Sequence, residues 1–457
     1  MERRGAHIVD RLMETPSAHR GGKKAATGVE RIASHARRNP EELYTVLMHH
    51  YSVENLRVCY ESLDGKKAIG VDGMSKEEYG EQLEGNLEDL HRRLRRMAYR
   101  PQPVRAVEIP KENGSMRRLG ISCTEDKIVQ EMTRRILEAI YEPVFIETSY
   151  GFRPKRSCHD ALRRLNKEVM DKPVNWVADL DLAKFFDTMP HKAIVTVLRI
   201  RIKDEKFLRL IIRMLKAGVQ TPGIVQYDEQ GSPQGSIVSP VIANIFLDYV
   251  LDKWFTEVVS QHCRGYSAII RYADDVAAMF EREEDARRFM GVLPRRLEKY
   301  GLRLNEHKTH LLAFGKGNAR RCLQSGERPP TFDFLGITHY WGRSRKGKVR
   351  IKRKTSKKRI RRALKQLNLW LGEVCSAYRL VDIWKVMGMK LRGHFNYFGV
   401  SDNRQALIHY KDKACKLLFK WLNRRSQRRS FTWASFLRYR ARYPLPRPGR
   451  LVCLYAS

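Results

Sequence analysis

Two adjacent aspartates stand between two short apolar stretches of the chain. Asp274 and Asp275 follow the run 268–272 and precede the run 276–280. Two such runs joined by a tight polar connection predict a β-hairpin with the aspartates at its tip. Because neighbouring carboxylates repel each other, we expect the tip to be either an ordinary exposed turn, in which Asp is common, or a cation-binding site.

A third carboxylate is available from an earlier predicted strand. The segment 176–182 has the alternation of a strand, which places Asp179 and Asp181 on one face with Val177. Three carboxylates suit two Mg²⁺ ions, which prefer hard oxygen ligands and also bind substrate phosphates. Two such ions about 4 Å apart activate a 3′-hydroxyl and stabilise the leaving pyrophosphate. Nucleotidyl transfer therefore fits these residues, with Asp179 and Asp181 competing for the third place.

Basic residues are concentrated in the last quarter of the chain. The 457 residues carry a formal net charge of +37, and residues 341–457 hold 32 Lys or Arg against four acidic residues. The run 343–354 contains no acid. Such a surplus predicts a polyanionic partner, with nucleic acid first and an anionic membrane surface second. The change in charge also predicts a domain boundary near residue 340.

Part of this basic segment is a candidate RNA-binding cluster. A charge run is often only a solvated face or a flexible tail. The surrounding helical and aromatic-rich sequence favours a phosphate-binding surface instead. The basic cluster, as we call it below, comprises Lys352, Arg353, Lys354, Lys357 and Lys358.

Several classes of protein are disfavoured. No apolar run approaches the roughly 20 residues that cross a bilayer, and the first residues lead into no signal-peptide core. The eight cysteines form no Cys-x-x-Cys pair, so reduced thiols are expected rather than disulfides or a zinc site. We expect a nucleic-acid-handling protein of the cytoplasm, associated with the nucleoid of a bacterial cell and without a membrane partner.

The remaining pattern predicts an α+β core followed by an all-helical basic module. Residues 1 to about 40 are polar and basic, which indicates a loosely ordered extension. The other predicted elements are helices over 41–62, 76–98 and 126–141 and a basic hairpin of strands over 104–110 and 117–121.

Nine stretches in a fixed order resemble group II intron reverse transcriptases, over about residues 45 to 450. Each motif alone is weak evidence, but nine in the right order leave little room for coincidence. The stretches are 70–74, 109–121, 149–162, 181–187, 231–240, 271–275, 301–309, 332–336 and 391–398.

The resemblance implies a right-hand polymerase, with fingers and palm built on an antiparallel sheet and followed by an all-helical thumb. Fingers and palm would occupy residues 45–340, and the helical thumb or maturase domain residues 341–422. A basic N-terminal extension, 1–44, would precede them, and a basic DNA-binding-like tail, 423–457, would follow.

The resemblance also assigns catalytic roles. It implies that Asp181, Asp274 and Asp275 are the catalytic carboxylates and that, together with Leu182, they hold Mg²⁺. Asp181 is preferred to Asp179 because the family places an aromatic residue five positions after its metal ligand, where Phe186 stands. That ring would exclude a ribose 2′-hydroxyl, although a plain core position is the alternative for Phe186.

The nucleotide-binding residues follow from the same motifs. Lys111 and Arg117 on the basic hairpin would hold the incoming triphosphate by charge-assisted hydrogen bonds. Gln234 would line the nucleotide pocket, and Lys308 would place a proton donor near the pyrophosphate. The alternative for each is an ordinary surface or turn residue. The implied set is Lys111, Arg117, Phe186, Gln234 and Lys308.

The implied function is RNA-directed DNA synthesis, together with binding of an intron RNA to assist its splicing and retrohoming. Expected partners are the intron RNA, an RNA template with a DNA primer, target DNA, deoxynucleoside triphosphates and a second copy of the chain as a homodimer. The alternatives are a maturase that only assists splicing and a reverse transcriptase used in defence. Many relatives carry a C-terminal His-Asn-His endonuclease with Cys-x-x-Cys pairs; none precedes Ser457, so we expect no second-strand cleavage.

Overall fold

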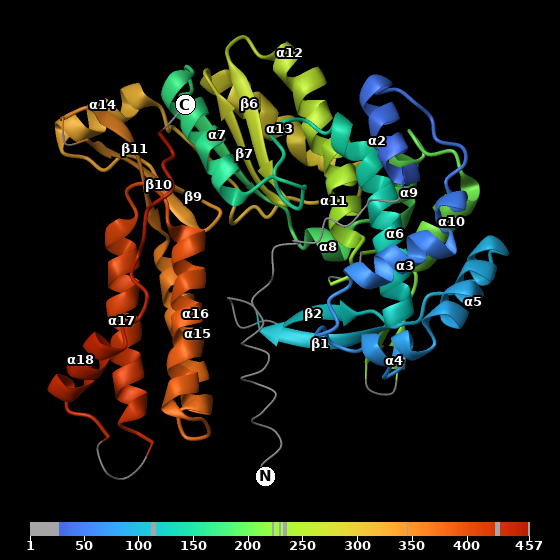
Figure 1. Ribbon diagram of the computed structural model, residues 1–457. Coiled ribbons are helices and arrows are strands. Elements are labelled where there is room, and N and C mark those ends of the chain that lie inside the picture. Colours follow the sequence, from blue (N-terminus) through green and yellow to red (C-terminus); the bar gives the residue numbers. More distant parts are fainter. Residues whose placement is uncertain are drawn as a thin grey trace. The chain divides into compact units, whose positions relative to one another are not determined.

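The computed structural model describes residues 27–110, 116–221, 224–227, 230–231, 235–344, 346–425 and 430–455 (Figure 1). Two compact units account for them. The larger unit contains the described residues up to Ala161 together with Trp176–Leu311, and the smaller unit contains Leu162–Asn175 together with the described residues from Leu312 onward. Each unit is described by itself below.

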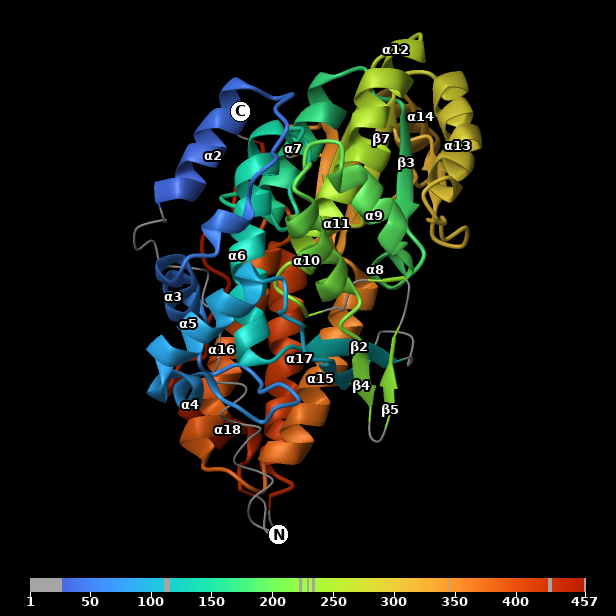
Figure 2. The same ribbon diagram turned by 90° about the vertical axis from the view of Figure 1, so that its right-hand side faces the viewer.

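The larger unit is built around an antiparallel sheet in which β3 (Trp176–Asp181) pairs with β7 (Asp275–Phe280). The predicted hairpin around the aspartate pair is confirmed, because β6 (Ser267–Tyr272) pairs with β7 from Ser267↔Phe280 to Tyr272↔Asp275. The sheet order is β6-β7-β3-β8, with β8 formed by His310–Leu312. The helix α13 (Glu283–Glu298) packs against β3 and β7, as Figure 2 shows.

One apolar core joins this sheet to the helices of the larger unit. In α5 (Leu83–Arg95) the periodic residues Leu87, Leu90 and Leu94 are buried, as their spacing predicts. Beyond α11 (Ser239–Leu247) the helix continues through two π-helical segments, Asp248–Lys253 and Phe255–Val259. The other helices of the unit include α3 (Val53–Ser62), α4 (Lys76–Glu81), α5 (Leu83–Arg95), α6 (Thr124–Tyr141), α9 (His191–Leu198), α10 (Glu205–Leu215) and α12 (Ser260–His262).

A second sheet of the larger unit contains the basic hairpin. As the alternation predicts, β1 (Val104–Pro110) and β2 (Met116–Ile121) pair antiparallel, with Val107 opposite Leu119. The sheet order is β2-β1-β4-β5, in which β4 (Val219–Thr221) runs parallel to β1 and β5 (Ile224–Gln226) forms the edge.

The N-terminal extension was expected to be loosely ordered, but its described part is helical; residues 1–26 lie outside the described residues. Residues 27–38 form α2 (Thr27–Arg38), which packs against α6 with Ile32 and Ala36 buried. The reason is an apolar stripe, Val29, Ile32, Ala33 and Ala36, at helical spacing, which the basic composition of the segment hides. The helix predicted over 41–62 begins only at Val53, where Ser52 caps it by accepting a hydrogen bond from the Asn55 amide.

The smaller unit combines a small sheet with four consecutive helices after it. The strands β9 (Phe332–Phe334), β10 (Ile337–Arg343) and β11 (Val349–Thr355) form an antiparallel sheet in the order β11-β10-β9. The helices α15 (Lys357–Val374), α16 (Leu380–Phe398) and α17 (Arg404–Leu422) surround a core that includes Leu371, Leu391 and Leu418, and Figure 1 shows α17 lying beside α15. The helix α18 (Trp433–Arg442) follows them, and α14 (Lys316–Ser325) precedes the sheet.

The expectation of helices alone after residue 341 is wrong for the first part of that region. Residues 349–355 form β11 instead, and Ile351, Arg353 and Thr355 point inward at every second position. The period of two is that of a strand, but basic residues fill the alternate positions, so the segment reads as a charge run. Residue 340, where the charge changes, lies within β10, whereas the C-terminal part of the smaller unit begins at Leu312.

The packing of α2 gives a stability test. Ile32→Ala should lower the free energy of unfolding by about 2–5 kcal/mol, because the change leaves a cavity in a buried site. Arg31→Ala, on the exposed face of the same helix, is the matched control and should change stability by no more than about 0.5 kcal/mol. Urea titration followed by circular dichroism measures both. Equal and small effects would return residues 27–38 to a loosely held extension.

Candidate active site

The hairpin tip holds the two adjacent aspartates in a tight turn between β6 and β7. Ala273 takes a left-handed conformation with φ of 56°, which is uncommon for a residue with a Cβ. Asp274 is half-buried, and Asp275 is exposed as the first residue of β7. The turn therefore presents one carboxylate at the surface and the other partly enclosed.

The strand register distinguishes the two candidates for the third carboxylate. Asp181 lies directly opposite Asp275, whereas Asp179 lies opposite Ala277, two residues farther from the tip. Residues directly opposite each other in an antiparallel pair have Cα atoms about 4.5–5.5 Å apart and side chains on the same face. The backbone therefore brings Asp181, and not Asp179, beside the hairpin tip.

A turn within the stretch 301–309, at residues 305–309, contacts Asp181. The Asn305 side-chain amide donates to Asp181 Oδ2 at 2.9 Å, and Lys308 Nζ lies 3.2 Å from the same oxygen. The backbone contributes as well, because the Asn305 amide donates to the Asp181 carbonyl at 2.8 Å and the Asp181 amide donates to Thr309 Oγ1 at 3.3 Å. Lys308, which was expected near the pyrophosphate, thus contacts Asp181, which was expected to bind metal.

The carboxylates near the hairpin tip have the chemistry to bind a divalent cation, although they do not form a complete set of ligands. Across the part of the chain that the structure describes, no three His, Cys, Asp or Glu side chains converge as a metal-binding set. The Asp181 carboxylate is engaged by Asn305 and Lys308. Carboxylate oxygens are nevertheless what Mg²⁺ prefers, and Asp181 and Asp275 stand opposite each other. Leu182 has a buried aliphatic side chain, so only its backbone carbonyl could contribute.

Phe186 lies in α8 (Phe185–Thr188), the short helix that follows β3. The residue is half-buried, and its ring lies edge-on to Phe185 with 5.2 Å between centroids. The backbone of Gly231 backs the helix so closely that a Cβ there would lie 3.0 Å from the Asp187 carbonyl oxygen. The ring is therefore held beside the end of β3 but is not enclosed in the core.

Gly235 lies directly against the basic hairpin. Gly235 has φ of 113°, and a Cβ there would lie 2.7 Å from the Gly120 carbonyl oxygen in β2, so glycine is required by both strain and space. Arg117 lies on β2 opposite Ile109, but its side chain is not among those that the structure describes. Lys111 and Gln234 lie outside the described residues.

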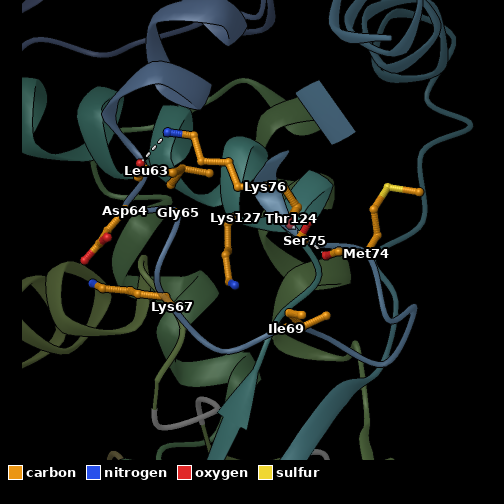
Figure 3. A pocket seen from close by; sticks show the side chains of 10 residues that line it. All are labelled: Leu63, Asp64, Gly65, Lys67, Ile69, Met74, Ser75, Lys76, Thr124 and Lys127. Atoms are coloured by element: carbon orange, nitrogen blue, oxygen red, sulfur yellow. Dashed lines mark hydrogen bonds between the residues drawn. The ribbon is translucent and has the colours of Figure 1, made fainter. Parts of the chain in front are cut away.

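A separate small pocket lies between the α3–α4 loop and the start of α6 (Figure 3). Two of its lysines face backbone oxygens, because Lys127 Nζ donates to the Ala68 carbonyl at 2.8 Å and Lys76 Nζ to the Leu63 carbonyl at 2.5 Å. These amines brace the loop. The pocket is formed by other elements than those that carry Asp181 and Asp275, and we do not assign it to the site.

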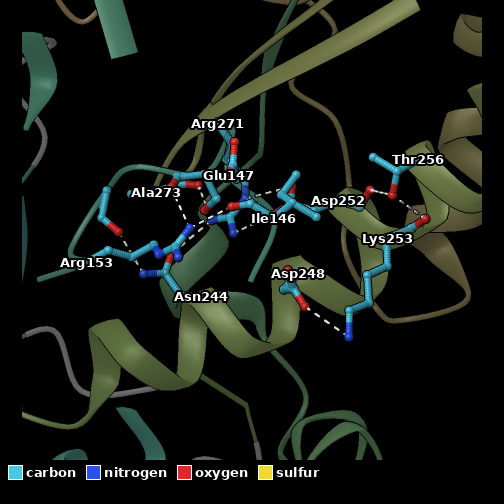
Figure 4. A network of polar contacts seen from close by, with 12 residues as sticks. Ile146, Glu147, Arg153, Asn244, Asp248, Asp252, Lys253, Thr256, Arg271 and Ala273 are labelled. Carbon is cyan, nitrogen blue, oxygen red and sulfur yellow. Dashed lines mark hydrogen bonds and ion pairs between the residues drawn. The ribbon is translucent and has the colours of Figure 1, made fainter. Parts of the chain in front are cut away.

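Sequence reasoning missed a buried polar network behind the hairpin tip (Figure 4). Asn244, Asp248 and Asp252 are each at most 3% exposed, and their spacing of four places them on one face of the helix that begins as α11. Arg271, directly before the tip, is fully buried and ion-paired with Asp252 at 2.6 Å. Three polar residues at i, i+4 and i+8 within an apolar helix were the available signal.

The basic cluster is divided by the alternation of β11. Arg353 is completely buried, and its Nη2 donates to Asn166 Oδ1 at 2.5 Å within the smaller unit; burial lowers the pKa of its guanidinium. Lys354, Lys357 and Lys358 are exposed, and Lys352 is half-buried. Four of the five residues therefore reach the surface, and Arg353 serves inside the fold.

Comparison with known proteins places these features in a family. Residues 109–339, which hold all three carboxylates and Phe186, match the family model described as reverse transcriptase (RNA-dependent DNA polymerase). The chain belongs to the reverse transcriptase family.

Individual relatives of this chain agree with the group II intron resemblance. The chain is 36% identical over 232 residues to the group II intron-encoded protein LtrA of Lactococcus lactis subsp. cremoris, covering 50% of this chain and 38% of that protein. It is 33% identical over 327 residues to protein YkfC of Escherichia coli (strain K12), covering 64% and 80% respectively. It is 44% identical over 159 residues to an uncharacterized 91 kDa protein in the cob intron of Schizosaccharomyces pombe, covering 35% and 19%.

The matched regions cover only part of the proteins compared. The chain spans less than two fifths of the length of the LtrA protein, and the exposed part of the basic cluster lies beyond the family match. Among the described residues, no helix is both long enough and apolar enough to cross a membrane.

Proposed function

We propose that this reverse transcriptase is encoded by a group II intron, synthesises DNA on an RNA template, and binds its intron RNA to assist splicing and retrohoming. The observation that carries the proposal is the register that puts Asp181 opposite Asp275 at the hairpin tip of a reverse transcriptase chain. A maturase that only assists splicing would have no use for this arrangement.

In this proposal Asp181, Asp274 and Asp275, with the Leu182 carbonyl, hold Mg²⁺. Bound Mg²⁺ would activate the primer 3′-hydroxyl and neutralise charge on the transferred and leaving phosphates. Lys308, whose amine lies 3.2 Å from Asp181, is near enough to the carboxylates to supply a proton to the leaving pyrophosphate. Lys111, Arg117 and Gln234 complete the nucleotide site.

The exposed part of the basic cluster supports the RNA-binding half of the proposal. Lys357 and Lys358 occupy the first turn of α15, which contains no acidic residue. Cations at a helix N-terminus are unfavourable because they face the positive end of the helix dipole, and a phosphate placed there would relieve that repulsion. A structured intron RNA offers phosphates in the irregular arrangement that a broad basic surface suits.

Carboxylate substitutions test the polymerase. Replacing Asp181, Asp274 or Asp275 by Ala should lower primer extension on an RNA template by about 1,000-fold or more, since each loss removes several kcal/mol of transition-state stabilisation. RNA affinity and the melting temperature should change little.

Asp179→Ala is the matched control for these variants. Asp179 lies on the same strand and face but opposite Ala277, so its loss should reduce extension by no more than about tenfold. Near-normal synthesis by any of the three alanine variants, with the protein folded, would contradict the assignment.

Sugar selection tests Phe186. Phe186→Ala should raise ribonucleotide incorporation relative to deoxynucleotide incorporation by at least about tenfold, because removal of the ring leaves room for a 2′-hydroxyl. Phe185→Ala, which truncates the buried neighbour, should lower stability without changing the ratio. Single-nucleotide incorporation kinetics measure the ratio, and an unchanged value for Phe186→Ala would make Phe186 a core residue only.

Neutralising the exposed lysines tests RNA binding. Changing Lys352, Lys354, Lys357 and Lys358 to Gln should weaken binding to a structured group II intron RNA and reduce the slope of log affinity against log salt by about 3, because fewer counterions are released. Splicing at low Mg²⁺ should slow, whereas extension of a short primer–template should change less.

A control of equal charge separates a specific surface from bulk electrostatics. Four exposed lysines of the larger unit, changed to Gln, remove the same charge and should reduce the salt slope far less; they are Lys192, Lys203, Lys206 and Lys299. Equal losses in the two variants would reduce the basic cluster to a general charge effect. If the wild type assists the splicing of no group II intron RNA, the maturase half of the proposal fails.

A further inference from the structure

A fully buried ion pair lies behind the hairpin tip of the larger unit (Figure 4). The side chains of Arg271 and Asp252 are both 0% exposed. Arg271 Nε lies 2.9 and 2.8 Å from the two carboxylate oxygens, and Nη2 donates to one of them at 2.6 Å. Asp252 belongs to the π-helical segment Asp248–Lys253, a rare conformation that often marks functional positions.

The remaining nitrogen of the guanidinium faces the turn itself. Arg271 Nη1 donates to the Ala273 carbonyl at 3.1 Å and to Asn244 Oδ1 at 2.9 Å. Ala273 is the left-handed residue of the turn, and its carbonyl belongs to the peptide bond that leads into Asp274. The contact therefore fixes the backbone orientation from which both aspartates project.

A short segment supports the turn from a third direction. Asn244 Nδ2 donates to the Gly151 carbonyl at 2.7 Å. Gly151 lies so close to the turn that a Cβ would be 2.3 Å from the Ala273 amide nitrogen. The Tyr150 amide also donates to the Arg271 carbonyl at 2.9 Å. Asn244 thus bonds both to the Gly151 carbonyl and to Arg271, and so connects the two groups that contact the turn.

A gain in folding stability does not explain well why this buried ion pair is present. The cost of removing two charges from water offsets most of their attraction, and apolar substitutes are often as stable. A guanidinium does offer a planar fork of donors that fixes several acceptors in set directions. Here those acceptors are the Asp252 carboxylate, the Asn244 amide oxygen and the Ala273 carbonyl.

We propose that Arg271, held by Asp252 and Asn244, is a positioning residue that fixes the hairpin turn and so aims Asp274 and Asp275. The inference rests on the proposed polymerase function and assigns it three residues that do not themselves contact the reacting groups. Partners that orient metal ligands are typically needed for full affinity and rate.

The primary test is Arg271→Lys. Lysine keeps a cation opposite Asp252 but lacks the fork that reaches Ala273 and Asn244. We expect kcat for primer extension to fall about 10- to 100-fold, with KM for primer–template within about twofold. Mn²⁺ binding to the complex with a terminated primer, measured by electron paramagnetic resonance, should weaken by a similar factor.

Arg201→Lys is the matched control, because Arg201 is also a buried arginine that donates to a backbone carbonyl, that of Ile140 at 2.7 Å. It should lower the melting temperature without changing kcat or Mn²⁺ affinity. Asn244→Ala is the second variant, since it preserves the Arg271–Asp252 pair. It should lower kcat about tenfold, and it decides the question if Arg271→Lys does not fold.

The outcomes separate the two proposals. If the wild type does not extend a primer on RNA, the proposed function fails, while the Mn²⁺ measurement still tests the positioning role. If the wild type is active and the folded variants at Arg271 and Asn244 match Arg201→Lys in kcat and Mn²⁺ affinity, the positioning role is wrong and the polymerase stands.

Discussion

The pairing of β3 with β7 is the constraint on which the candidate site depends. Asp181 faces Asp275 only in this register, and a shift by one residue would turn every side chain of β3 to the other face of the sheet. Ala178 and Leu180 of β3 join Val276 and Ala278 of β7 in the same buried core. The same register buries Val177, Ala277 and Met279 on the other face and places Asp181 opposite Asp275 at its end.

Placing Asp181 opposite Asp275 brings two carboxylates near each other, and their mutual repulsion has to be offset. On one strand, Asp181 is held by Asn305 and by the amine of Lys308. At the hairpin tip, the buried guanidinium of Arg271 binds the backbone of the turn rather than the aspartates themselves. The exposed amine of Lys308 thus supports the site from one side, and the buried guanidinium of Arg271 supports it from behind. Asp275 stays exposed, so in the proposed function a nucleotide and its cation could approach it.

Local patterns predicted the parts of the structure that depend on neighbours in sequence. Both hairpins and the strand with Asp181 follow from alternation and turn chemistry, and the buried leucines of α5 follow from helical spacing. The patterns failed where charge masked periodicity. Ile32 and Ala36 lie in a basic segment, and Arg353 lies on a strand whose alternate positions are also basic.

Contacts between distant residues were beyond sequence reasoning. Arg271 meets Asp252, Asn244 and the Tyr150 amide across 19 to more than 100 positions of chain. Nothing in the spacing specifies that these groups meet, although polar residues repeated every fourth position in an apolar helix mark that a partner must exist. Because Asp179 and Asp181 share one face, alternation alone left both open, and the choice of Asp181 rested on the family's aromatic spacing. The strand register adds that Asp181, and not Asp179, lies opposite Asp275.

Iron-directed cleavage of the protein itself can locate the bound cation. Fe²⁺ replaces Mg²⁺ at oxygen-rich sites and, with peroxide, cuts the chain beside the ion. In the complex with an RNA template, a terminated DNA primer and the next deoxynucleotide, we expect cuts near residues 181 and 274–275, suppressed by excess Mg²⁺. Cleavage confined to other segments, in a preparation that extends primers on RNA, would contradict that expectation.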